Sequence, residues 1–176
     1  MGFLCQPTNP PPSPRVMVYH RSCPDFELVH CSKITSCADL LVFDVVRPGQ
    51  PTVTIVNIYN PPQHAKRQTS AVYILCTLNQ PQNRPIILAG DWNLHHPYWS
   101  ADDKPPHSVC SDMVEWLDSH EFLMHNQKGK ITCLRKNRDL VLDHTFSNAV
   151  ACQIDLIKNW QLDVPLSGAS DHISTT

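Results

Sequence analysis

The chain has 176 residues, of which 41% are hydrophobic, and its formal net charge is −2. This length and hydrophobic content are typical of a single domain with a real core. Proteins that bind nucleic acid through charge alone are usually strongly basic, so any such contact here must rely on local basic patches or on a bound cation.

Targeting and membrane signals are not visible in the sequence. No stretch approaches the roughly eighteen consecutive apolar residues of a membrane span, so we expect no membrane partner. The opening residues MGFLCQ match neither a secretory signal nor the myristoylation pattern. The eight cysteines are spread along the chain without a Cys-x-x-Cys pair. This favours reduced, buried thiols over disulfides or a structural zinc site.

The first half of the chain begins with a Pro-rich lead-in over residues 1–14, in which PTNPPPSP is extended and cannot be a central strand. A spacer is a better interpretation of it than a recognition motif. Strands are predicted at 15–19, 39–46 and 53–59, the last two joined in a hairpin by the turn Pro48-Gly49. A helix is predicted at 67–78, and the short apolar run 85–90 predicts a buried central strand.

The second half continues with a polar loop to about residue 107. Residues 108–121 give the clearest helical pattern, with apolar residues on one face. Strands are predicted at 129–134, 140–146 and 159–165. Neither a repeat nor a domain boundary is visible, so residues 15–176 are expected to form one domain. Many strands with two helices indicate sheets covered by helices.

Polar residues mark four predicted strand ends. Residues two apart in a strand point to one face, so Asp91 and Asn93 should aim together beyond the sheet edge. Each polar group also has an ordinary interpretation as a turn former, an edge carboxylate or a solvated tail. Together they are the groups that bind a hard cation such as Mg²⁺ and move a proton. The groups are Asn57, Tyr59 and Asn60, then Asp91 and Asn93, then Asp143, and finally Ser170, Asp171 and His172.

Four segments in this order, VNIYNPP, ILAGDWNLHHPYW, LDHTFSN and SDHIS, resemble the motifs of the endonuclease/exonuclease/phosphatase superfamily. The second segment is most similar to the apurinic-type endonuclease domains of non-long-terminal-repeat retrotransposons, especially fungal ones. The resemblance runs from about Arg15 to the last residue. It implies an α+β fold, the DNase I-like four-layer αββα sandwich of two mixed sheets face to face, here with N-terminal strands missing.

The resemblance also implies roles for individual residues. His172 matches the histidine that prepares water or holds the scissile phosphate, with Asp143 orienting it. Asp91 matches the aspartate that activates the water, and Asn93 the amide that holds the phosphate. Tyr59 matches the tyrosine near the leaving group, and Asp171 a metal-site carboxylate. The implied reaction is hydrolysis of a DNA phosphodiester that depends on Mg²⁺ or Mn²⁺, next to a reverse transcriptase domain in longer relatives.

Further residues are candidate substrate contacts. Asn57, His95 and His96 are candidates, and for the histidines simple loop packing is an equal alternative. The basic run at 135–138 is interpreted either as a phosphate contact or as a solvated hairpin tip.

The pattern departs from the family at the N-terminus, where a Gln-Glu step that supplies the principal metal ligand has no counterpart. The chain contains only Glu27, Glu115 and Glu121, none of them in a matching position. We therefore expect weakened cation binding and impaired activity in a domain truncated at both ends. The alternatives are a non-catalytic remnant that binds nucleic acid or protein, and a phosphoesterase of the same superfamily that acts on small substrates. Localisation stays open, although work on chromosomal DNA would require the nucleus.

Overall fold

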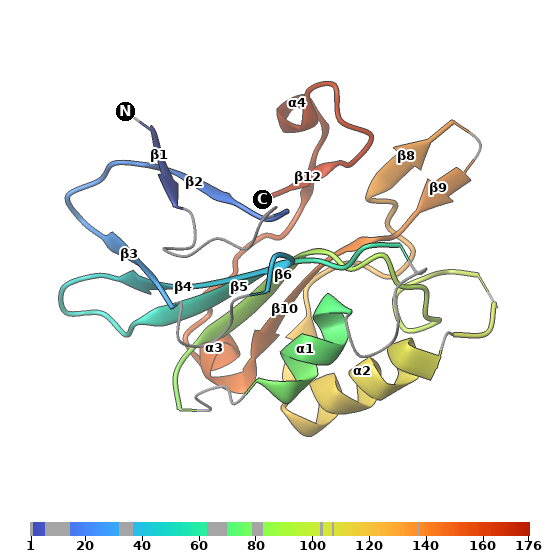
Figure 1. The fold of residues 1–176 in the computed structure, drawn as a ribbon, viewed down its shortest axis with the longest axis horizontal. Helices are drawn as coiled ribbons and strands as arrows, with labels where there is room; N and C mark the ends of the chain where they lie inside the picture. The colour runs from blue at the N-terminus through green and yellow to red at the C-terminus, as the bar shows by residue number, and fades with distance from the viewer. Residues whose placement is uncertain are drawn as a thin grey trace.

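The computed structural model describes residues 2–5, 15–31, 37–62, 70–78, 83–102, 104–106, 108–136 and 138–176. Its centre is a mixed sheet of six strands in the spatial order β3-β4-β5-β6-β10-β7 (Figure 1). β5 and β6 are parallel, and the other neighbouring pairs are antiparallel. The strands are β3 (Glu27–His30), β4 (Leu40–Val46), β5 (Val53–Tyr59), β6 (Ile86–Asp91), β7 (Phe122–Met124) and β10 (Asp143–Asn148).

Three predicted strands, 39–46, 53–59 and 85–90, correspond to β4, β5 and β6 within one residue at each end. The predicted hairpin between β4 and β5 is confirmed, and Gly49 adopts a φ of 71° in its turn. A residue without a side chain enters this left-handed region at little cost. The sequence pattern is strongest in these strands because most of their residues are apolar and every one of them is buried or half-buried.

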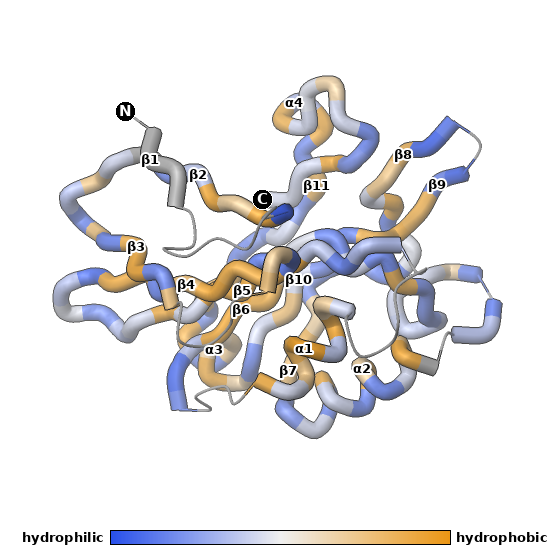
Figure 2. The backbone as a smooth tube through the Cα atoms, viewed as in Figure 1, coloured by the Kyte–Doolittle hydropathy of each residue, from blue (hydrophilic) through white to orange (hydrophobic). Residues whose placement is uncertain are grey.

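The two faces of the sheet enclose separate apolar clusters. Along β4, Leu40 and Val42 belong to the larger cluster, whereas Leu41 and Phe43 belong to the smaller one with Val16. Consecutive strand residues point to opposite faces, which produces this division. In Figure 2 the most hydrophobic backbone accordingly runs through the central strands.

Two helices, α1 (Ala71–Thr77) and α2 (Ser108–Ser119), pack on the face that carries the larger cluster (Figure 1). The side chain of Ser70 accepts the backbone N–H of Tyr73 and so caps α1. Met113 and Leu117 of α2 are buried in the cluster. Both helices were predicted, although residues 67–69 of the first prediction lie outside the described residues.

The opposite face carries further strands (Figure 1). Val16 and Val18 pack on Leu41 and Phe43 from this side. The helices, the six-stranded sheet and this second layer of strands confirm the predicted α+β sandwich of DNase I type. The elements on this side are the pair β1 (Gly2–Cys5) and β2 (Val18–Arg21), the pair β11 (Leu162–Asp163) and β12 (Ser174–Thr175), and helix α4 (Val164–Ser167).

Several predicted bounds were wrong. The strand predicted at 159–165 is strand only at β11, because the side chain of Asp163 caps α4 and Pro165 lies in the first turn of that helix. The strand predicted at 15–19 is found as β2. The stretch 129–134 begins with a turn at Gly129, and the stretch 140–146 divides between two sheets. The remaining elements are β8 (Cys133–Arg135), β9 (Arg138–Leu140) and α3 (Ala149–Gln153).

Residues 6–14 of the expected lead-in lie outside the described residues. In the part of the chain that the structure describes, no helix combines the length and the apolar character that a membrane crossing requires.

Candidate active site

Three polar side chains form a row across neighbouring strands at one edge of the central sheet. Tyr59 of β5 is the register partner of Asp91 in β6, and Asp91 is the register partner of Asp143 in β10. Register partners in adjacent strands project their side chains to the same face. The sheet therefore brings together three residues, of which the first and the last are 84 positions apart in the sequence (143 minus 59).

The turn after β6 fixes Asp91 and Asn93. Gly90 has a φ of 139°, and a Cβ atom there would overlap with the backbone carbonyl of Ile58. Asn93 has a φ of 45°, a region in which asparagine is better tolerated than most residues. Its backbone N–H donates to Asp91 Oδ1 at 3.0 Å, and its Nδ2 donates to Asp91 Oδ2 at 2.7 Å. The two side chains therefore act as one rigid unit.

His172 completes the row from the C-terminal segment. Its Nδ1 lies 2.8 Å from Asp143 Oδ2, and its Nε2 lies 3.9 Å from Asp91 Oδ2. The imidazole thus stands between two carboxylates, hydrogen-bonded to one and facing the other. A carboxylate on Nδ1 fixes the orientation of the ring and favours a proton on that nitrogen, which leaves Nε2 for chemistry.

A short backbone pairing holds His172 in place. Cys133 and His172 form an antiparallel bridge, and the neighbouring N–H groups of Leu134 and Ile173 donate across it to Asp171 and Thr132, each at 2.7 Å. The buried hydroxyl of Thr132 also accepts the backbone N–H groups of Leu142 and Asp143. One threonine thereby ties the start of β10 to the strand beside His172.

The electrostatics of the row raise the pKa of both of its carboxylates. Burial and the neighbouring charge of Asp143 raise the pKa of Asp91 from 3.8 to about 6, although His172 opposes the rise. Burial also raises the pKa of Asp143, against the effect of its contact with His172. A carboxylate with a pKa close to neutral can accept a proton from water in a reaction near neutral pH.

Asp171 adjoins His172 in the chain and contacts residues of β8. Its Oδ2 lies 3.7 Å from Arg135 Nε and 4.0 Å from the Cys133 thiol, and the side chain is 55% exposed. Ligand atoms of Cys133, Asp171 and His172 lie within 4.8 Å of one another. Mg²⁺ fits this set through the carboxylate only, because it takes oxygen ligands and completes its shell with water and substrate phosphate.

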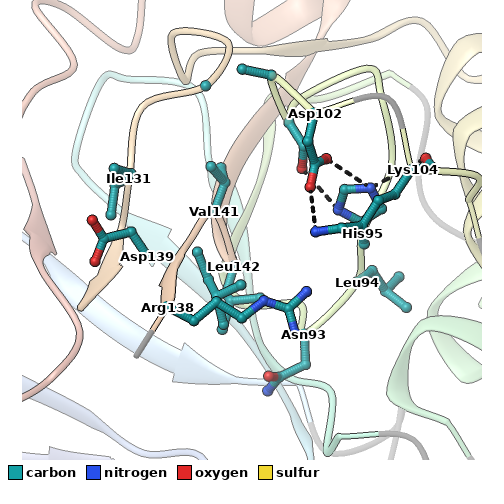
Figure 3. A pocket seen from close by; sticks show the side chains of 14 residues that line it. Asn93, Leu94, His95, Asp102, Lys104, Ile131, Arg138, Asp139, Val141 and Leu142 are labelled. Carbon is teal, nitrogen blue, oxygen red and sulfur yellow. Dashed lines mark hydrogen bonds and ion pairs between the residues drawn. The ribbon is translucent and has the colours of Figure 1, made fainter. Parts of the chain in front are cut away.

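Two depressions adjoin the row. A cavity of about 240 Å³ lies directly beside Asp143 and His172. A larger groove of about 410 Å³ begins at Asn93 and runs between the loop that carries His95, Asp102 and Lys104 and the residues in and after β9 (Figure 3). On one wall His95 contacts Asp102, which also pairs with Lys104, and Arg138 and Asp139 stand on the other.

The candidate substrate contacts are distributed unevenly around the site. His95 lines the groove, and its Nδ1 lies 3.2 Å from the hydroxyl of Ser100. His96 packs its ring against Trp99 and accepts the backbone N–H of Tyr98. Asn57 lies on the same face as Tyr59, and its Nδ2 donates to the carbonyl of Met17 at 3.3 Å. Of these three, only His95 lines the groove.

Sequence reasoning missed several neighbours of the row. The guanidinium of Arg15 forms a two-point ion pair with Asp39 and lies 5.7 Å from the ring centre of Tyr59. Thr132 and Cys133 were treated as ordinary strand residues. No local pattern marks these residues, because their roles depend on which segments meet.

Comparison with known proteins identifies the family and the fold. The family model described as endonuclease–reverse transcriptase matches residues 53–176. A search of the curated proteins finds no match.

Solved structures share the fold at low identity. The endonuclease domain of TRAS1, a telomere-specific non-LTR retrotransposon, superposes with a TM-score of 0.78 at 19% identity, over 99% of this chain and 78% of that domain. An endonuclease/exonuclease/phosphatase from Beutenbergia cavernae gives 0.54 at 17% identity, over 77% of this chain and 37% of that one. The catalytic domain of Xenopus laevis APE2 gives 0.52 at 18% identity, over 78% and 54%. Because the family model covers well over half of its residues, the chain belongs to the endonuclease–reverse transcriptase family of the endonuclease/exonuclease/phosphatase superfamily.

Proposed function

We propose that this protein hydrolyses phosphodiester bonds in DNA with the help of a divalent cation, as the endonuclease of a retrotransposon. The observation that carries the proposal is the line Asp143–His172–Asp91, in which one imidazole stands between two partly buried carboxylates. Such a line supplies an oriented proton carrier next to a base with a pKa near neutral. A folding role alone does not require it, since burying two carboxylates close together is unfavourable.

In this proposal Asp91 accepts the proton of the attacking water. Its pKa of about 6 leaves it ionised at neutral pH yet basic enough to take a proton as the phosphorus–oxygen bond forms. His172 holds the scissile phosphate through Nε2, and Asp143 keeps the ring in position through Nδ1. The 3.9 Å between Nε2 and Asp91 Oδ2 is too long for a direct hydrogen bond, and both atoms can contact one oxygen of the substrate.

We assign Asn93 to holding the phosphate and Tyr59 to a position near the leaving oxygen. Asn93 is held rigidly by Asp91, so its amide is positioned before the substrate arrives. Tyr59 lies in the same row on the other side of Asp91. Neutral donors fixed in this way stabilise the negative charge that develops on the phosphoryl oxygens.

The cation is assigned to Asp171. When bound, Mg²⁺ or Mn²⁺ neutralises the charge that builds on the phosphate. We expect weak binding, because Asp171 already faces Arg135 and because all three glutamates of the chain are exposed elsewhere, one in β3 and two in and after α2. Impaired activity compared with relatives that have a glutamate ligand follows from this arrangement.

DNA is proposed to lie along the groove of Figure 3. Lys104 and Arg138 provide cations on its two walls, with His95 beside Lys104 and the Arg138 side chain directed toward Asn93. Asp102 and Asp139 limit the positive charge, so the contact should be local. A reverse transcriptase domain is the expected partner in a longer protein.

The test is nicking of supercoiled plasmid by the purified chain in Mg²⁺ and in Mn²⁺. We expect nicking that is stronger in Mn²⁺ and that falls at least about a hundredfold in His172→Ala and Asp143→Asn. The matched control, His120→Ala directly after α2, where the ring stacks on Trp116, should nick normally. Nicking that survives His172→Ala would refute the assignment.

A non-catalytic role is favoured by one observation, the lack of any glutamate at the site. It predicts DNA binding without nicking in either metal. A superfamily enzyme for small substrates would instead cleave a chromogenic phosphodiester and leave plasmid intact.

A further inference from the structure

We propose that Cys133, Asp171 and His172 form a binding site for Zn²⁺, and that zinc held there inhibits the enzyme. The inhibitory consequence depends on the function proposed above, whereas the binding site does not. Among the described residues, these three are the group of metal-ligating side chains that lie close enough together to share an ion, with ligand atoms within 4.8 Å of one another.

The backbone already holds the three ligands together. Cys133 and His172 are bridge partners, and the N–H of Leu134 donates to the carbonyl of Asp171 at 2.7 Å. Tetrahedral zinc places its ligand atoms about 3.3 to 3.8 Å apart, given bonds of about 2.0 to 2.3 Å. Ligand atoms that now lie up to 4.8 Å apart would therefore have to approach one another by about 1 Å.

The ligand types select the ion. A thiolate, an imidazole and a carboxylate are the donors that zinc takes, whereas Mg²⁺ avoids sulfur. Cys133 has no part in the proposed hydrolysis, and its Sγ lies 4.0 Å from Asp171 Oδ2. Three protein ligands with a fourth position left for water describe an accessible zinc site, consistent with the exposure of Asp171.

A second shell for zinc is also present. Asp143 contacts Nδ1 of His172 at 2.8 Å, so Nε2 is the nitrogen that would bind the ion. A histidine that ligates zinc usually donates its other N–H to a carboxylate, which orients the ring and increases its basicity. The contact that prepares His172 for hydrolysis is therefore the one that prepares it for zinc.

Arg135 works against binding. Its Nε lies 3.7 Å from Asp171 Oδ2, and the guanidinium must leave the carboxylate when zinc arrives. The side chain is 45% exposed, so it can turn toward solvent. Arg135→Gln should therefore tighten zinc binding, whereas a purely structural cluster would be indifferent to this change.

Zinc at this position removes His172 from the substrate. Nε2 would be bonded to the ion and unable to contact the scissile phosphate. The same ion would also occupy Asp171, to which we assign the catalytic cation. Zinc should therefore inhibit nicking at concentrations far below those of the Mg²⁺ or Mn²⁺ that supports it.

Titration with Co²⁺, which replaces zinc and reports sulfur ligation by a thiolate-to-cobalt charge-transfer band, tests the site directly. We expect a band that saturates at one equivalent, disappears on addition of Zn²⁺ and is lost in Cys133→Ser. The matched control is Cys23→Ser, which removes a thiol close to another carboxylate, that of Asp25 at 3.4 Å. A band that survives Cys133→Ser, or is lost in Cys23→Ser, overturns the proposal.

Two further variants distinguish the loss of a metal ligand from a folding defect. Asp171→Asn changes an exposed side chain and should weaken cobalt binding at least tenfold with an unchanged circular dichroism spectrum. Arg135→Gln should strengthen it severalfold. Equal affinities in all three proteins would refute the ligand assignment.

The binding and functional proposals can fail separately. Cobalt titration of Asp91→Asn, which should not nick DNA, is expected to give the band seen in the wild type. If the wild-type protein gives the cobalt band but does not nick DNA, the proposed function is refuted and the proposed metal site is supported. If it nicks DNA but gives no cobalt band, the proposed metal site is refuted and the proposed function is supported.

Discussion

Replacing Asp91 by asparagine should stabilise the domain while it abolishes nicking. The side chain of Asp91 is 16% exposed and shares its surroundings with Asp143, so its ionised form is unfavourable in the folded protein. Asparagine has nearly the same shape and no charge, and its oxygen can still accept the backbone N–H of Asn93. The substitution removes the charge together with the hydrogen bond that Asp91 Oδ2 accepts from Asn93 Nδ2, because the new amide nitrogen is a donor.

The magnitude follows from the pKa. The pKa of Asp91 is about 6 in the folded protein and 3.8 in the reference state. A group whose pKa is raised on folding contributes stability below pH 3.8, and that stability is lost as the pH rises through 6. At neutral pH the loss is up to about 3 kcal/mol, and because the two carboxylates share the effect we expect a gain of about 1 to 3 kcal/mol in Asp91→Asn.

The assay is urea unfolding of the wild type and the variant at pH 3.5, 5 and 7.5, with pH values chosen around these two pKa values. The advantage of Asp91→Asn should be near zero at the lowest pH and should grow to its full value at the highest. Asp155→Asn is the matched control, because Asp155 is exposed and has a φ of 49°, which asparagine tolerates. Equal stability of wild type and Asp91→Asn at pH 7.5 would contradict the electrostatic account of the site.

Three further predictions concern pH and packing. Nicking by the wild type should fall about tenfold for each pH step below 6, because Asp91 must be ionised to accept a proton, and a flat profile between pH 5 and 7 would exclude it as the base. His144 is buried against Trp99, and among the described residues neither ring nitrogen has a hydrogen-bond partner, so burial lowers its pKa to about 3. A pKa lowered on folding gives stability that is present above pH 6.5 and lost as the pH falls, so the advantage of His144→Phe in urea unfolding should grow by about 2 kcal/mol from pH 7 to pH 5. Gly90→Ala should cost more than about 3 kcal/mol, because its Cβ would overlap with the Ile58 carbonyl, and a variant that melts like the wild type would disprove the tight approach of β5 to β6.

Much of the central sheet could be predicted from sequence because three of its strands, β4, β5 and β6, are mostly apolar. Gly or Pro residues lie close to their ends, and these signals are local. β3 and β7 are short and only partly buried, so their patterns did not stand out. The strand predicted at 140–146 begins at Asp143 instead, because Leu140 pairs with Cys133 in the β8–β9 hairpin. That pairing depends on a distant contact.

For the site, the sequence predicted the groups but not their arrangement. Asp91 with Asn93, Asp143 and His172 could be proposed because together they are groups that bind a hard cation and move a proton, and because their segments resemble the motifs of a known superfamily. The spacing of the cysteines argued against zinc, yet Cys133 lies beside Asp171 and His172 because residues 132–134 pair with residues 171–173. Cysteine spacing along the chain cannot reveal a ligand set drawn from two segments.

By itself, the sequence determined the buried strands, the two main helices and the polar groups that each strand end presents, since hydrophobic periodicity and turn chemistry act over a few residues. Only the tertiary structure decided that Tyr59, Asp91 and Asp143 share one register across three strands, and that His172 stands between two carboxylates. Strand register and the meeting of remote segments depend on the packing of the whole sheet, and no local pattern encodes them.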